Sequence, residues 1–189
     1  MIRIDPRSYF FGALLILLLP LDWLMAAVGA AAFHELCHAL GIYLLGGKIK
    51  SVCISVGGAV METEIPGKGR ELLCALAGPM GSLLLISFCH IFPKLAICAG
   101  VQGIFNLLPV YPLDGGRAVR CCLDLCIPKK AEGIQITIEI MALISLAALA
   151  AAGTFVLSMG ILPLFVTALF ILKAILRKRP CKRKRFGVQ

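Results

Sequence analysis

Charged residues are scarce in this chain of 189 residues, because Asp, Glu, Lys and Arg together make up only 15% of it. Hydrophobic residues make up 60%, and the mean hydropathy is +0.95. A soluble domain cannot bury that much apolar surface, so the composition excludes a soluble globular protein and predicts an integral membrane protein. The first apolar segment is followed by no A-x-A-like cleavage site, so we expect it to be retained rather than removed as a signal peptide.

Acidic residues are the scarcer of the two charge types, with 10 against 19 Lys and Arg, which gives a net charge of +9. We expect about six membrane crossings with both termini in the cytoplasm, and on this topology Lys94 is the only basic residue outside. This distribution explains the net charge without a nucleic-acid partner and predicts a multi-pass protein of the cell membrane. The basic tail, residues 173–189, is expected to be cytoplasmic and to lie against anionic lipid of the bilayer.

Cysteines number nine, an odd total, and they are scattered through apolar segments. This distribution does not favour a disulfide framework, so we interpret the cysteines as small hydrophobic residues. Cys121, Cys122 and Cys126 lie close together, but their spacing is not typical of a zinc site and no histidine is near.

Histidines are rare too, and two of the three lie in a single H-E-x-x-H motif formed by His34, Glu35 and His38. Residues four apart on a helix share a face, so the two imidazoles are placed to bind one metal ion. Glu35 lies at the edge of that face, where a carboxylate can act on a metal-bound water without being a ligand. The motif also arises by chance on soluble amphipathic helices. Here Glu35 is the only charged residue in 24–45, and an ionisable group in such an apolar segment indicates a functional site.

Six apolar segments are expected to form transmembrane helices, namely residues 8–21, 24–45, 72–92, 95–108, 133–153 and 154–172. Two prolines and two glycines break the chain after the fourth segment, over residues 109–116, and residues 117–130 are expected to lie along the membrane interface. The predicted fold class is an all-α membrane protein, and residues 1–189 are expected to form a single domain.

A β-hairpin is expected between the second and third helices. Two β-prone runs within residues 48–64 flank the pair Gly57-Gly58, which is a hairpin signal. One interpretation is an ordinary surface hairpin. The other is a hairpin that re-enters the membrane beside the metal site, where a strand edge lining a wet cavity could pair with an extended substrate.

The third metal ligand is left open by the residues alone. A catalytic zinc site needs three protein ligands and one open position. Leu44 stands where an extended histidine motif would supply the third, and His90 lies near the outer end of the 72–92 segment, which is too shallow. The acidic candidates are Glu62, Glu64, Glu71 and Asp114, the last of which lies in the helix break.

The chain resembles the site-2 proteases, the zinc intramembrane metalloproteases of peptidase family M50. The resemblance rests on His34-Glu35-x-x-His38 and on an Asn-x-x-Pro-x-x-x-x-Asp-Gly pattern, and more weakly on Ala77-Gly78-Pro79 with Ser82. The pattern is formed by Asn106, Pro109, Asp114 and Gly115. The match covers most of residues 24–120, which would form the catalytic core, flanked by helices in 8–21 and 133–172. The arrangement resembles the bacterial sporulation-protease branch of the family, without its CBS domain and without a PDZ insertion.

This resemblance implies roles for individual residues. His34, His38 and Asp114 would bind one zinc ion per chain, and Glu35 would activate the water. Asn106 would lie close to the metal and hold the substrate or the transition state, and the hairpin around Gly57 and Gly58 would correspond to the family's re-entrant loop and bind substrate.

The implied activity is zinc-dependent endoproteolysis of membrane-protein substrates within the bilayer. The resemblance does not decide whether the protein has a regulatory membrane partner. The alternatives are a membrane metal transporter and a catalytically inactive module that binds membrane proteins. An inactive relative would be expected to have lost a ligand or the base, whereas this sequence retains Glu35 and all three residues implied as ligands.

Overall fold

The structure is a computed structural model that describes residues 2–4, 16–17, 20–55, 58–155, 167–168 and 171. The chain divides into two compact units, Met1–Thr137 and Ile138–Gln189, and the contacts discussed below lie within the first. The expected segments 8–21 and 154–172 lie mostly outside the described residues, and Gly57 and the basic tail lie wholly outside them. The single-domain organisation and the tail's location therefore stay predictions.

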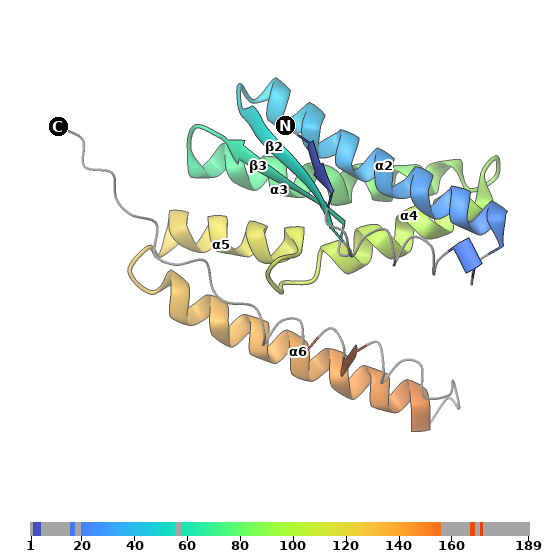
Figure 1. Cartoon of the computed structure of the whole chain (residues 1–189). Coiled ribbons are helices and arrows are strands. Elements are labelled where there is room, and N and C mark those ends of the chain that lie inside the picture. The colour runs from blue at the N-terminus through green and yellow to red at the C-terminus, as the bar shows by residue number, and fades with distance from the viewer. Residues whose placement is uncertain are drawn as a thin grey trace. The chain divides into compact units, whose positions relative to one another are not determined.

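The described elements are mostly helices, with one small sheet (Figure 1). The helices are α2 (Leu21–Leu44), α3 (Lys68–Leu84), the 3-10 helix η1 (Leu85–Phe88), α4 (Pro93–Asn106), α5 (Asp114–Cys126) and α6 (Ala131–Phe155). The strands are β1 (Ile2–Ile4), β2 (Lys48–Ser55) and β3 (Gly58–Glu64).

Three stretches among the described residues are long and apolar enough to cross a membrane: Leu21–Leu44, Lys68–Phe88 and Ala131–Thr154. They coincide with three of the six expected crossings. A fourth expected segment forms α4, whose 14 residues fall short of the roughly 20 that a full crossing needs. The structure is thus a mainly helical membrane fold, and the total of six crossings stays a prediction.

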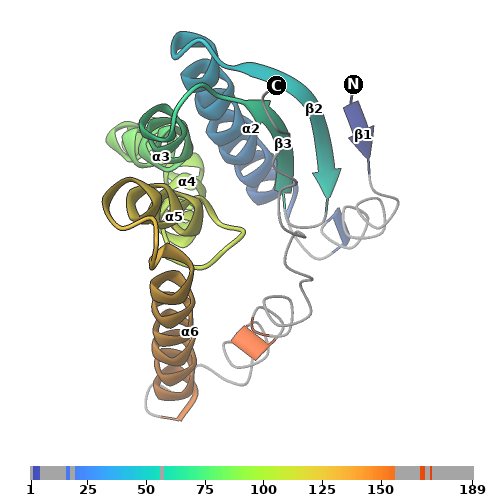
Figure 2. The ribbon, with the colours of Figure 1, turned by 90° about the vertical axis from the view of Figure 1, so that its left-hand side faces the viewer.

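The expected hairpin is present as β2 and β3, which pair antiparallel, with Gly58 opposite Ser55. The sheet also contains β1, which pairs parallel with the other edge of β2, so the strand order is β1-β2-β3 (Figure 2). The all-α expectation therefore has to include a three-stranded sheet. β1 was not predicted, because three residues are too few to show an alternating pattern. Re-entry of the hairpin into the membrane stays a prediction.

Small residues allow α2 and α3 to pack closely. A Cβ atom added at Gly81 of α3 would overlap the Cys37 side chain, and one at Gly41 of α2 would lie 3.0 Å from Ala77 Cβ. The same principle operates between α3 and α4, where a Cβ at Gly103 would lie 3.0 Å from Ser82 Cβ. Close backbone approach of this kind is typical of membrane helices, because lipid tails leave packing as the main attraction between them.

The starts of α2 and α4 are joined by an ion pair between Asp22 and Lys94. The Lys94 ammonium also lies 5.7 Å from the centre of the Trp23 ring, within the range of a cation–π contact. The expected topology puts both helix starts on the outer side of the membrane, opposite the cytoplasm, and their pairing is consistent with it.

The α2–α3 contact predicts that Gly81→Ala destabilises the protein, because the added methyl group overlaps the Cys37 side chain and that side chain or a helix must shift. Overpacking of this kind costs about 1–3 kcal/mol, which should lower the thermal unfolding midpoint of the detergent-purified protein. Gly69→Ala on the same helix is the control, since a Cβ there meets nothing within 4 Å. Equal midpoints for the two variants would contradict the packing argument.

Candidate metal centre

His34 and His38 project from one face of α2 into the interior of the helical unit, as their spacing predicts. Both are buried, with 2% and 7% of their surfaces exposed. The Nε2 atoms of the two rings lie 3.2 Å apart. Close packing is needed on the α3 side, because a Cβ atom at Gly78 would overlap the His38 ring.

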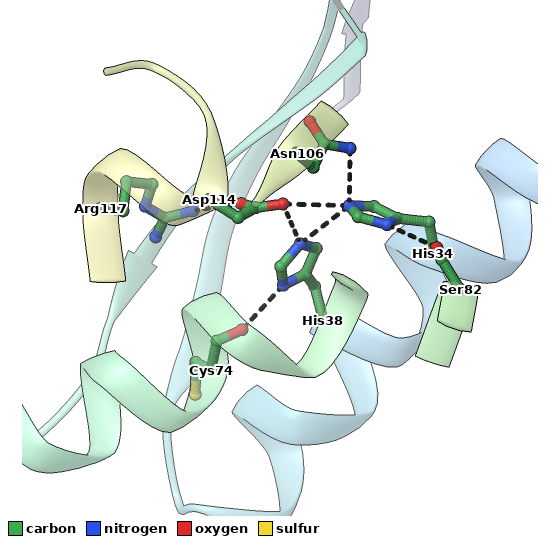
Figure 3. A network of polar contacts seen from close by, with 7 residues as sticks. All are labelled: His34, His38, Cys74, Ser82, Asn106, Asp114 and Arg117. Carbon is green, nitrogen blue, oxygen red and sulfur yellow. Dashed lines mark hydrogen bonds and ion pairs between the residues drawn. The ribbon is translucent and has the colours of Figure 1, made fainter. Parts of the chain in front are cut away.

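Asp114, the first residue of α5, lies against both histidines (Figure 3). Its Oδ2 atom is 3.0 Å from His34 Nε2 and 3.0 Å from His38 Nε2. The helix break allows this contact. Pro109 and Pro112 prevent α4 from continuing, and the chain turns back before α5 begins. A Cβ at Gly115 would overlap the Leu107 carbonyl oxygen, so glycine is needed for this return. The fold thereby brings Asp114 into contact with His38, although the two residues are 76 positions apart in the sequence.

The outer ring nitrogens of the histidines have partners on α3. His38 Nδ1 is 2.8 Å from the carbonyl oxygen of Cys74, and His34 Nδ1 is 2.8 Å from Ser82 Oγ (Figure 3). A carbonyl oxygen can only accept, so His38 Nδ1 carries the proton and donates it. The Nε2 lone pair of His38 then points toward Asp114, and Ser82 can accept from His34 Nδ1 in the same manner. Such outer partners orient metal-bound histidines.

The three inner atoms fit a bound cation. When both Nδ1 atoms carry the proton, the two Nε2 lone pairs and the carboxylate oxygen are all acceptors. Three acceptors 3.0–3.2 Å apart repel one another unless a cation or proton lies among them. Ligand atoms placed tetrahedrally at about 2.0–2.1 Å from zinc are about 3.3 Å apart, close to these separations. Among the described residues, His34, His38 and Asp114 form the only group of three such side chains, with ligand atoms within 4.8 Å of one another.

Two further polar side chains border this cluster. Asn106, the last residue of α4, has its Nδ2 atom 3.4 Å from His34 Nε2. Arg117 on the first turn of α5 lies 3.8 Å from Asp114 Oδ1, the oxygen that faces away from the histidines (Figure 3). Glu35, the expected base, is half-buried on α2 between the two histidines in sequence. It is not one of the three clustered residues.

The other acidic candidates for the third ligand lie elsewhere. Glu62 accepts a hydrogen bond of 2.9 Å from Ser51, and Glu71 pairs with Lys68 at 2.9 Å. Glu64 pairs with Lys50, whose ammonium group lowers the pKa of that carboxyl. His90 is exposed beyond η1. None of these four joins the described three-residue cluster.

Two features of the site were not predicted from the residues. Ser82 entered only as a small or polar position of a family pattern, and its contact with His34 requires the exact crossing of α2 and α3. The Cys74 carbonyl acts through the backbone, so no side-chain pattern could reveal it.

Comparisons with known proteins find similarity to zinc metalloproteases. Residues 73–149 match the model of peptidase family M50. The zinc metalloprotease MJ0392 of Methanocaldococcus jannaschii is 33% identical over 138 residues, which are 65% of this chain and 38% of that protein. The chain therefore spans little more than a third of the length of this relative. The site-2 protease structure from the same organism matches 99% of this chain and 94% of its own, with a TM-score of 0.64 at 21% identity.

The fold is that of a site-2 protease, with a buried cluster of two histidines and one aspartate at its centre. Over the matched regions the chain is similar to peptidase family M50 and to a named zinc metalloprotease.

The contact between Ser82 and His34 predicts that Ser82→Ala weakens metal binding. Loss of an outer partner of a metal-bound histidine typically lowers metal affinity about 10–100-fold. The measurement is zinc affinity by competition with a chelator, on detergent-purified protein. Ser87→Ala serves as the control because Ser87 is exposed on η1. Identical affinities in the two variants would show that Ser82 does not orient His34.

Proposed function

We propose that this protein is a zinc-dependent endopeptidase that cleaves membrane-protein substrates within the bilayer. One observation carries the proposal: the buried convergence of two imidazole nitrogens and one carboxylate oxygen beside the glutamate of an H-E-x-x-H helix. The match of residues 73–149 to peptidase family M50 and the apolar helices support it.

In the proposed site, His34, His38 and Asp114 would hold one zinc ion. When bound, zinc would supply Lewis acidity that polarises a carbonyl oxygen and lowers the pKa of a water towards neutrality. Glu35 acts as the general base that takes the proton from the attacking water, and it then returns a proton to the leaving amine. The Asn106 amide donates a hydrogen bond to the carbonyl oxygen of the substrate as negative charge develops on it.

A transmembrane substrate hides its carbonyl groups in helical hydrogen bonds, so it has to unwind before cleavage. We propose that it does so by adding as a strand to the β2–β3 hairpin, near Gly58 and the adjacent Gly57. β1 occupies one edge of β2, so the available edge is that of β3, which lies beside α2 (Figure 2). The proposed location is the cell membrane, with several crossings and both termini in the cytoplasm.

The ligand assignment predicts that Asp114→Ala loses zinc. Removing one of three protein ligands leaves two, which do not hold a catalytic zinc ion firmly. Zinc bound per chain is measured by metal analysis of the detergent-purified protein, and about one ion is expected for the wild type. Glu71→Ala is the control, since Glu71 is an acidic residue that lies outside the cluster. If Asp114→Ala retained zinc and the control lost it, the third ligand would be Glu71 or a residue near it.

The assignment of the base predicts that Glu35→Gln keeps zinc and loses cleavage. Glutamine has nearly the same shape but cannot take a proton, and general acid–base catalysis contributes typically about 10²–10⁴-fold. The measurement compares new N-termini in membrane proteins of cells that express the wild type or the variant. Termini within transmembrane segments should appear only with the wild type.

The two alternative functions give different results in the same preparations. A metal transporter would move zinc into proteoliposomes without new N-termini appearing, and a binding module would retain membrane proteins without cleaving them. Equal cleavage by wild type and Glu35→Gln would exclude the role of Glu35 as the base.

A further inference from the structure

A buried glutamine lies near the start of α6, a helix that is otherwise largely apolar. Gln135 is 7% exposed. A buried amide costs about 1–3 kcal/mol unless it forms hydrogen bonds, so its partners indicate what it does. Thr137, two residues further along, is exposed, and its hydroxyl donates to the Gly133 carbonyl of its own helix. The two side chains therefore have different roles on the same helix.

Gln135 contacts α5 at two points that are four residues apart. Its Nε2 atom donates to the Gly116 carbonyl oxygen at 3.4 Å, and its Oε1 atom accepts from Arg120 Nη1 at 3.4 Å. Residues four apart lie on one face of a helix. Gln135 therefore contacts a backbone carbonyl and a side chain on one face of α5. The nearer of these two contacts, at Gly116, is two residues after Asp114.

The first turn of α5 has little room to shift elsewhere. A Cβ atom at Gly116 would lie 2.5 Å from the Tyr111 nitrogen, and one at Gly115 would overlap the Leu107 carbonyl. This turn is therefore packed directly against the loop that follows α4, while Gln135 binds one of its carbonyl groups. A shift of this turn therefore displaces the loop or moves Asp114.

The contact also continues to α3. Arg120 Nε lies 3.1 Å from Asp124 Oδ1, and Asp124 Oδ2 lies 3.3 Å from the ammonium of Lys68 at the start of α3. Further along α3 are Cys74 and Ser82, the partners of the two histidines. A chain of polar contacts thus joins Gln135, the helix that begins with Asp114 and the helix that orients both imidazoles.

We propose that Gln135 is a positioning residue for the metal centre. It holds the first turn of α5 so that Asp114 Oδ2 stays close to both histidine Nε2 atoms. The proposal rests on the proposed function only in taking Asp114 as a zinc ligand. It makes the start of α6 a functional part of the site, although the described metal-ligand group contains no residue of α6.

The test compares the full-length variants Gln135→Met and Thr137→Val in detergent. Methionine has a similar length but forms neither hydrogen bond, so we expect zinc affinity to fall about 10–100-fold, as for other outer contacts of metal ligands. Cobalt bound in place of zinc should show a changed visible absorption spectrum, since the spectrum depends on ligand geometry. Thr137→Val should retain both the affinity and the spectrum. A purely structural role for Gln135 would lower the unfolding midpoint without changing either property of the folded protein.

A second variant, Gln135→Glu, keeps an acceptor for Arg120 but removes the donor to the Gly116 carbonyl. It should also bind zinc more weakly than the wild type, and it decides the question if Gln135→Met does not fold. Unchanged zinc affinity and an unchanged cobalt spectrum in the folded Gln135 variants would overturn this inference alone. A folded wild type that binds no zinc would overturn the proposed function and this inference together.

Discussion

The arrangement of the site depends on three acceptor atoms that are held closer together than they would lie unaided. His34 Nε2, His38 Nε2 and Asp114 Oδ2 are 3.0–3.2 Å apart in a buried position. Their mutual repulsion has to be balanced by a cation or a proton, and the surrounding structure has to keep the atoms in place. The three helices that supply or orient these atoms, α2, α3 and α5, are each fixed by contacts outside the cluster.

Glycine and backbone groups provide much of this support. Gly78 leaves space for the His38 ring, and Gly115 lets the chain return after α4. The Cys74 carbonyl selects the His38 tautomer whose lone pair faces the cluster. These groups contribute little buried apolar area. Their contribution is geometric, because each sets how closely two segments approach and therefore where a ligand atom lies.

The sequence predicted the local features well. The four-residue spacing of the histidines, the hairpin and the break after the segment 95–108 depend on periodicity or on proline and glycine, and each of these operates over a few residues. The residues alone did not decide whether Asp114 or one of three glutamates is the third ligand. The choice depends on how the loop before Asp114 folds, and Asp114 lies 76 positions from His38 in the sequence. The family resemblance favoured Asp114. β1 and the contacts of Gln135 were not predicted, since a three-residue strand and one glutamine among the polar residues of α6 carry no pattern.

The ion pair between Asp22 and Lys94 bears on how the protein enters the membrane. On the predicted topology, Lys94 is the only basic residue that has to be moved to the outer side. A free charge moved against a potential of 100 mV requires about 2.3 kcal/mol of work, whereas a neutral pair requires none. Because Asp22 lies beside Lys94, the two helix starts would carry no net charge once together. Retention of the inner segments would then depend on the cytoplasmic lysines and arginines alone, and removing Asp22 would leave an uncompensated positive charge on the translocated side.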